Sequence, residues 1–276
     1  MRKLYLLNEN EEAYYFDFST KTLISDISDL GFKKDLTFLD YENERVLIRE
    51  NNSNSIIELE LIFLNGYKGY TNFINYKMRS SGRLRLCYVV NKEMKYVFVA
   101  IESLTKTELH YLSLKCSLSL NKLSMWYKDI SSSIVLKEPA DGKLYSYKYP
   151  YVYGSGYDGS QWFTNSGEID AALNIMIQGA VVNPKLYIID HNEVIATLSI
   201  LVESENCIIE INSDVTNQYM IMKENGITSN IYQKQDFRFD NFLFLPRGTY
   251  LLKFDSGVED YHTFCRISYK EGYSGH

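Results

Sequence analysis

The chain has 276 residues, 45% hydrophobic and 23% charged, which is a globular composition in a chain long enough for two domains of ordinary size. Its net charge is −6 and it has no basic cluster, so the electrostatic footprint of a protein that holds nucleic-acid phosphates is missing. No stretch approaches the roughly 18 apolar residues of a membrane span. The N-terminal apolar run breaks at Asn8, too early for a signal peptide, and we expect a protein made in a cytoplasm.

Aromatic residues are frequent, with 24 tyrosines and 14 phenylalanines. Aromatic side chains favour strands, so we expect a mainly β protein. Four cysteines stand far apart without a CxxC pair, at positions 87, 116, 207 and 265. In a chain of this size such cysteines act as small buried hydrophobes rather than as a disulfide framework or a zinc site.

The first 50 residues predict two hairpins. Residues 3–7 and 14–18 are short apolar runs on either side of the polar turn NENEE. In residues 30–49 apolar and charged positions alternate, and a charged tip at 42–45 divides the segment. We expect a long hairpin or arm here, whose apolar residues need a surface outside their own domain.

Residues 55–64 give the clearest strand of the first half, because their apolar side chains alternate with glutamates. After Gly66 the period changes to that of a helix over 67–79. Its predicted apolar stripe consists of Tyr70, Phe73, Ile74 and Met78. This is the one substantial helix that we expect.

Three further strands complete the first half. Residues 84–90 and 96–101 are joined by an Asn-Lys-Glu turn, and apolar residues alternate with polar ones from Leu112 to Leu120. His110 falls on the apolar face of this last strand. A lone histidine there is expected to be a satisfied core residue rather than a ligand or catalyst.

A joint between two unlike halves lies within residues 122–156. It contains Pro139, Pro150, a serine triplet at 131–133 and a closing Gly-Ser-Gly. Such punctuation is typical of a domain boundary. We predict an N-terminal domain over 1–135, a linker over 136–159 and a second domain over 160–276.

The second half predicts short strands at close spacing, separated by good turn formers such as Asn225-Gly226. The predicted strands are residues 171–178, 185–189, 194–201, 207–211, 219–222, 242–245, 249–254 and 261–269. Seven or eight strands without a convincing helix imply a β-sandwich, jelly-roll-like in character.

Residues 154–159 match GxGxxG, the loop that brings a dinucleotide pyrophosphate to a helix N-terminus. A dinucleotide site needs a strand before the loop and a helix after it. Here Pro150 precedes the loop and Gly167 interrupts the segment after it, so a flexible linker is the better interpretation.

Two acidic groupings are candidate sites of chemistry. Glu168 and Asp170 near Trp162 resemble a glycosidase pair beside a sugar-stacking ring, but carboxylates two apart on one strand are commonly a solvated edge. Asp255, Glu259, Asp260 and His262 form an oxygen-rich turn. This turn lacks the spacing of a known calcium loop. The histidines pair with no serine or cysteine in a nucleophile motif. We therefore predict no enzyme activity, no cofactor and no metal.

A family resemblance rests on the order and spacing of several segments. In the first half these are SIIELELIFLNGYKGYTNFINYKMRS, RLRLCYVV, KYVFVAI and LSMWYKD, and in the second SGEIDAALNIMIQGAVVNPKLYI and FLFLPRGTYLLKFDSG. Taken together they resemble the distal tail proteins of long-tailed phages that infect Gram-positive bacteria. The likeness covers essentially the whole length, although none of the segments is a sharp motif.

The resemblance implies an α+β N-terminal split barrel with one helix, followed by a galectin-like β-sandwich. It further implies six copies in a ring at the tail tip of the virion, through which DNA passes. The ring would join the major tail (tube) protein above and the tail-associated or tail-tip protein below, and would carry receptor-binding proteins where the phage has them. Neither a membrane nor a specific nucleic-acid sequence is an expected partner.

The arm at 30–48 is the expected contact between neighbouring copies, since an apolar-edged hairpin can close a heterologous ring. Its candidate interface residues are Phe32, Leu36, Phe38 and Tyr41. The alternative function is a carbohydrate-binding module for attachment to the host surface. Under that alternative, Trp162 and Tyr232 are the candidate sugar contacts.

Overall fold

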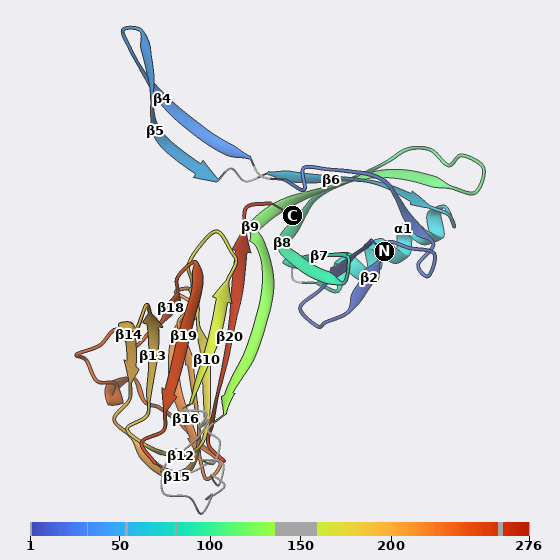
Figure 1. The fold of residues 1–276 in the computed structure, drawn as a ribbon. Helices are drawn as coiled ribbons and strands as arrows, with labels where there is room; N and C mark the ends of the chain where they lie inside the picture. Colours follow the sequence, from blue (N-terminus) through green and yellow to red (C-terminus); the bar gives the residue numbers. More distant parts are fainter. Residues whose placement is uncertain are drawn as a thin grey trace, which may run out of the picture. The chain divides into compact units, whose positions relative to one another are not determined.

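The structure, a computed structural model, describes residues 2–31, 33–52, 55–80, 82–135, 159–258 and 262–275. The chain divides into two compact units, one of residues 1–128 with 272–276 and one of residues 129–271. Strands predominate in both, so the predicted mainly β fold is confirmed (Figure 1). The predicted linker, residues 136–159, lies outside the described residues except for Gly159.

The first unit is an open antiparallel sheet with one α-helix. Its strands are β1 (Lys3–Leu7), β2 (Ala13–Tyr15), β3 (Thr22–Ser28), β6 (Ile56–Phe63), β7 (Leu84–Val90), β8 (Glu93–Lys106) and the first part of β9 (Leu114–Val135). The hydrogen-bonded order is β3-β6-β9-β8-β7-β1-β2. The described strands do not close into a barrel, because β3 and β2 are the two ends of this order and do not pair with each other.

Strict alternation explains why β6 and β9 form the centre of this sheet. Leu59 and Leu61 of β6 are fully buried and lie opposite Leu118 and Cys116 of β9. The residues between them point to the other face, as the period of two requires. All four cysteines of the chain are buried, as the sequence predicted.

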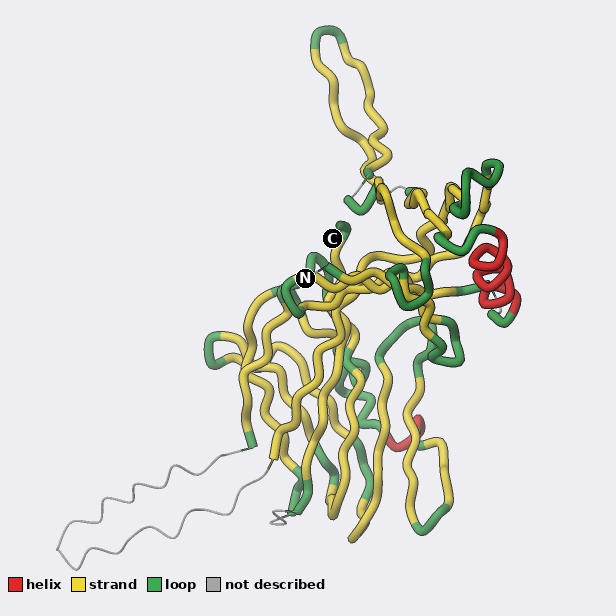
Figure 2. Tube along the Cα trace, turned by 90° about the vertical axis from the view of Figure 1, so that its right-hand side faces the viewer, coloured by secondary structure: helices red, strands yellow, loops and turns green. Residues whose placement is uncertain are grey.

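Helix α1 (Tyr67–Met78), red in Figure 2, packs on the end of β6. Gly66 caps it with φ of 55°, where a Cβ would stand 2.7 Å from the Leu109 side chain. The positive φ therefore disfavours any other residue at Gly66, and a Cβ there would also require the Leu109 side chain to move. Two turns on, the centroid of the Phe73 ring lies 6.2 Å from that of Phe63 and 5.0 Å from that of Tyr14.

Two details of the predicted first half are wrong. Met78, assigned to the apolar stripe of the helix, is 74% exposed, and Tyr76 is buried instead, with its hydroxyl donating to the Glu12 carbonyl at 3.2 Å. His110 and Leu112 are exposed in the connection between β8 and β9. They therefore do not lie on a core face, because β9 begins only at Leu114.

Between β3 and β6 the chain makes the predicted arm, a hairpin of β4 (Lys34–Tyr41) and β5 (Glu44–Asn52). Among the described strands, β4 and β5 pair only with each other. At the root of the arm the Lys122 ammonium donates to the Gly31 carbonyl at 3.1 Å.

The second unit is a two-layer β-sandwich. One layer has the order β14 (Glu193–Ser199), β13 (Lys185–Asp190), β19 (Gly248–Asp255), β10 (Ser160–Asn165). The other includes β17 (Ile227–Asn230), β16 (Tyr219–Glu224), β15 (Glu203–Asn212), β12 (Asn174–Val182) and β20 (Phe264–Tyr273). The pair β11 (Ala171–Ala172) and β18 (Phe244–Leu245) and the 3-10 turn η1 (Tyr232–Lys234) complete the unit.

The inner faces of both layers meet in one apolar core. Leu186 and Phe254 come from one layer, and Ile177 and Ile209 from the other. Gly179 lets β12 pass close to Thr263. Its φ is 124°, and a Cβ there would stand 2.4 Å from the Thr263 hydroxyl. The register shifts directly after Gly179, so the strand bends at this point.

Strands β9 and β20 each belong to both units. The division falls between Lys128 and Asp129 in β9 and between Glu271 and Gly272 in β20. Within the second unit the end of β9 is structural, because Ile134 is 2% exposed and lies in the core.

Candidate assembly surfaces

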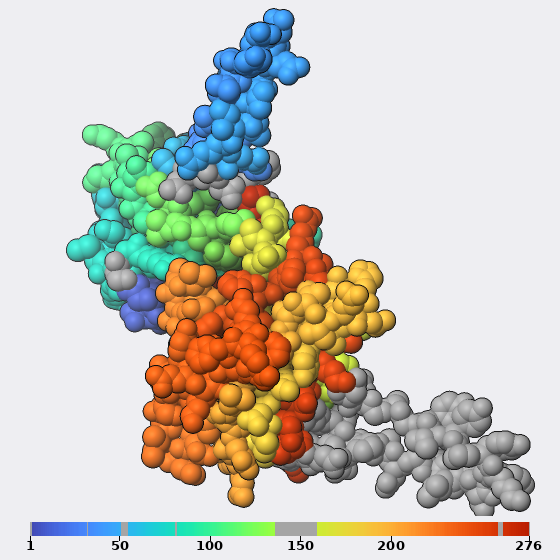
Figure 3. Space-filling model, turned by 90° about the vertical axis from the view of Figure 1, so that its left-hand side faces the viewer, coloured from blue at the N-terminus to red at the C-terminus, as the bar shows by residue number. Residues whose placement is uncertain are grey.

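The arm carries the largest group of exposed apolar side chains in the described first unit. Every residue of β4 is exposed. The large apolar residues exposed on the hairpin, blue in Figure 3, are Leu36, Phe38, Leu39, Tyr41, Val46, Leu47 and Ile48. The predicted interface residues Leu36, Phe38 and Tyr41 are among them, whereas Phe32 lies outside the described residues.

Apolar side chains occupy both faces of the arm. Phe38 lies opposite Leu47, and the next pair, Leu39 and Val46, points to the other face. The polar contacts of the arm are local: Arg45 pairs with Asp40 at 3.2 Å and lies 4.5 Å from the Phe38 ring. Lys34 pairs with Glu50 across the hairpin. An isolated two-stranded hairpin is marginally stable in water, so this one needs a further surface.

An opening lies between the two ends of the first unit's sheet. Its volume is about 520 Å³. One wall is Leu23–Ile27 of β3, and the other consists of residues 2–4 and 15–17, in and beside β1 and β2. The described sheet of the first unit is therefore open between β3 and the β1–β2 pair.

Two cross-strand rows on the exposed face of the same sheet are polar and acidic. One cross-strand row consists of Ser28, Glu58, Ser119 and Ser103, and the next consists of Asp26, Glu60, Ser117 and Thr105. These two rows contain three carboxylates and no cationic side chain. These two rows therefore disfavour a bound polyanion, whereas Lys115 lies on the same face in the next row.

The outer face of the second unit's four-stranded layer carries an apolar row. Trp162 lies opposite Leu251, which lies opposite Ile189, which in turn lies opposite Val194. Trp162 is 64% exposed, more than any other member of the row. The candidate sugar contact Trp162 is thus accessible on the outer face of this sheet.

The other candidate sugar contact, Tyr232, begins the turn η1. Its ring is half exposed and stacks on Phe242 at a centroid distance of 6.1 Å. The loop that follows also exposes Phe237 and Phe239, which sequence analysis did not single out. The sequence signal that could have identified these exposed rings is the segment QDFRFDNF, in which phenylalanines alternate with polar residues.

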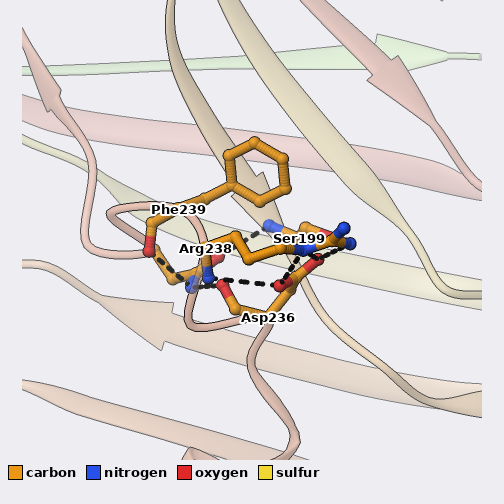
Figure 4. A network of polar contacts seen from close by, with 5 residues as sticks. Ser199, Asp236, Arg238 and Phe239 are labelled. Carbon is orange, nitrogen blue, oxygen red and sulfur yellow. Dashed lines mark hydrogen bonds and ion pairs between the residues drawn. The ribbon is translucent and has the colours of Figure 1, made fainter.

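A hydrogen-bond network fixes this aromatic loop, residues 232–242 (Figure 4). The Asn241 amide accepts from the Ser199 backbone N–H at 2.7 Å and donates to the carbonyls of Asp236 and Phe239 at 2.8 and 3.1 Å. Asp236 N–H donates in turn to the Ser199 carbonyl at 2.9 Å. In Figure 4 the Phe239 ring points away from these bonds. The loop is therefore held rigid while its rings stay accessible.

Arg238 reinforces the loop through a bidentate contact with Asp236. The guanidinium donates from Nε to Oδ1 at 2.9 Å and from Nη2 to Oδ2 at 2.6 Å. This side-chain hydrogen bonding holds the pKa of the Asp236 carboxyl below its ordinary value. Asp236 is accordingly a permanent anion near neutral pH.

The candidate chemical groupings do not assemble in the described residues. Glu168 and Asp170 are exposed between β10 and β11. The GxGxxG segment, except its last glycine, lies outside the described residues, as do Glu259 and Asp260. Within the described ranges no group of three or more acidic, histidine or cysteine side chains is arranged to hold a metal. No described helix is long and apolar enough to cross a membrane.

Two solved phage structures share this fold over essentially the whole chain. One is from the phage P2 baseplate in its activated conformation with calcium: identity is 15%, the TM-score is 0.66, and all of both chains is covered. The other is the SPP1 Dit protein, described as a paradigm of the hub adsorption apparatus in phages infecting Gram-positive bacteria. Its identity is 10% and its TM-score 0.64, with 97% of this chain and 98% of that chain covered. The fold is thus that of phage baseplate and tail-hub proteins.

The family match is narrower and more specific. Residues 3–123 match the family model described as distal tail protein, N-terminal domain. This match confirms the resemblance to the distal tail protein family that the sequence indicated. Comparison with curated proteins gave no match.

Proposed function

We propose that this protein is the structural hub of a phage tail tip, where six copies form a ring. The observation that carries the proposal is the arm, a two-stranded hairpin with exposed apolar residues on both faces. Such a hairpin on a compact unit favours a heterologous contact, in which each copy offers its arm to the next. Leu36, Phe38 and Tyr41 are the proposed interface residues of the described arm.

The ring would surround a channel that lets DNA pass. The acidic rows that contain Glu58 and Glu60 support this, because phosphates slide past carboxylates without binding. Above and below, the ring would contact the major tail protein and the tail-associated protein. Receptor-binding proteins, where present, would attach to it. The protein would act at the virion tail tip, after synthesis in the host cytoplasm, and its role is structural rather than enzymatic.

Mass measurement of the purified protein by light scattering tests this proposal. We expect a hexamer. Triple replacement of Leu36, Phe38 and Tyr41 by serine is expected to yield a folded monomer, because the apolar contact between copies is lost. Deletion of the whole arm should do the same and leave the second unit folded.

The matched control replaces three exposed acidic residues of the same hairpin, Asp35, Glu42 and Glu44, by serine. This variant should remain hexameric, since it keeps the apolar side chains. A wild-type monomer, or an arm deletion that still forms rings, contradicts the proposal.

A second candidate function is carbohydrate binding, favoured by the exposure of Trp162 on the outer sheet face. An exposed indole can stack on a sugar ring. A monomer that binds host cell-wall glycans, and loses binding on Trp162→Ala or Tyr232→Ala, would support this function over the hub.

A further inference from the structure

The opening in the first unit is lined by a strand edge rather than by a strand face. Five consecutive residues of β3, Leu23–Ile27, line it. Successive side chains of a strand point to opposite faces, so consecutive residues can share one opening only when the edge of the strand faces it. The register agrees, because β3 pairs with β6 along one edge and with no other described strand.

The opposite wall is the end of the β1–β2 pair. In β1 the pairing with β2 covers Tyr5–Leu7 only, so Lys3 extends past the end of β2. Beyond that end the Phe16 N–H donates to the Leu4 carbonyl at 3.2 Å. The Leu4 carbonyl is thus already engaged, and the free strand edge at this gap is that of β3. An unpaired strand edge of this kind is a template for another strand.

The arm has the properties that such a strand needs. Strand β4 has eight residues and β3 has seven, so both span roughly 25 Å at about 3.3 Å per residue. The outer edges of the hairpin are unpaired in the described chain, and its apolar side chains are uncovered. The tip carries Arg45 beside Asp40, Glu42 and Glu44, and the opening is lined by Asp17 and Asp26 as well as Arg2 and Lys3, so charge does not oppose the contact.

The occupant must come from another copy. All eight residues of β4 are exposed, so the arm of a chain does not fill the opening of the same chain. By contrast, residues 100–106 of β8, which pair with β9 but extend beyond β7, expose no large apolar side chain that needs covering. Of the free edges in the described first unit, the arm is thus the one that gains most from the contact.

We propose that the opening between β3 and the β1–β2 pair receives the arm of a second copy, whose β4 pairs along the β3 edge. This inference rests on the proposed function, because it assigns the acceptor site of the contact that closes the ring. The inserted strand would complete the split barrel of one subunit with a segment of its neighbour.

Cysteine cross-linking in the full-length protein tests the assignment. Two differently tagged chains are co-expressed, one with Ser25→Cys in β3 and the other with Asp35→Cys, Thr37→Cys or Leu39→Cys in β4. After mild oxidation, we expect a covalent dimer for at least one of the three arm positions. The native thiols give little background because all four are buried.

The matched control pairs Ser25→Cys with Glu102→Cys, an exposed position on β8. A disulfide requires Cα atoms within about 7 Å, so the arm pair should give about tenfold more dimer than this control. More dimer from Glu102→Cys than from every arm position would overturn the inference and assign the opening to β8 of the next copy.

Three further outcomes also decide the matter. Rings of the expected mass with no arm cross-link overturn the inference and leave the proposed function standing. A cross-link that forms only within a chain carrying both cysteines shows that the arm folds back on its own subunit, which also overturns it. A wild-type monomer removes the proposed function, and the inference with it.

Discussion

At the scale of single residues, the ion pair of Arg238 and Asp236 is a measurable part of the aromatic loop. The pKa of Asp236 is lowered chiefly by its hydrogen bonds to Arg238, so the ionised carboxylate is favoured in the folded state. Stability from such a group is complete above the carboxyl's unfolded pKa, about 4, and is lost as pH falls through the lower folded pKa.

Arg238→Ala should therefore lower the Tm near neutral pH, and the difference from wild type should shrink as the solution is acidified. Thermal unfolding of both proteins between about pH 7 and about pH 2.5 measures this. Arg247→Ala, in the turn before β19, is the control and should cause a smaller change at every pH. A deficit of Arg238→Ala that stayed constant with pH would show that the ion pair does not contribute in this way.

Residue periodicity predicted which positions are apolar but not always which of them are covered. Helical spacing selected Phe73 correctly and Met78 wrongly, because the face that meets the sheet is set by β6 and by the Glu12 carbonyl that receives Tyr76. His110 was misplaced for a similar reason. The predicted alternation began at Leu112, two residues before β9 starts at Leu114. His110 was therefore assigned to a strand although it lies in the turn before it.

At the scale of elements, the arm was predictable because alternation and a charged tip are local features. Its isolation was not, since the lack of pairing with β3 or β6 depends on the whole sheet. The opening beside β3 was invisible for the same reason. Only the register of several strands shows that one edge is left without a partner.

Hydrogen exchange should distinguish the arm from the sheet that carries it. In a monomeric variant, such as the triple serine replacement, amides of β4 and β5 should exchange close to the unstructured rate. An isolated hairpin opens at almost no free-energy cost. Amides of β6 and β9 should be protected in the same sample, and the arm should gain protection in the assembled wild type. Arm amides as slow as those of β6 in the monomer would contradict this.

At the scale of the whole molecule, composition and turn spacing were enough to predict two β-rich parts and a sandwich. The exact division was harder to predict. Proline and glycine mark a joint after residue 135, whereas the compact units part at Lys128, inside a continuous strand. A strand that serves two cores has no change of pattern at the boundary, so local punctuation cannot locate it.

The predicted domain ranges remain a prediction, and two fragments test them. A fragment of residues 129–271 should be more stable than one of residues 160–271, because only the longer one keeps Ile130 and Ile134. Burial of Ile134 alone is worth about 1.5–3 kcal/mol. Urea unfolding of both fragments gives the comparison. Equal midpoints would mean that the end of β9 is dispensable to the second core.

Strands β9 and β20 each run from one unit into the other, and this has a consequence for how the protein can evolve. Residues 129–271 are an insert, because the chain leaves the first unit once and returns to it at Gly272, where Tyr273 packs beside the first core. The Lys95 ammonium lies 3.9 Å from the centroid of the Tyr273 ring, and this cation–π contact stabilises the C-terminal segment on the first unit. Recombination at these two points can thus replace the entire sandwich in one exchange, while the architecture that carries the arm is inherited unaltered.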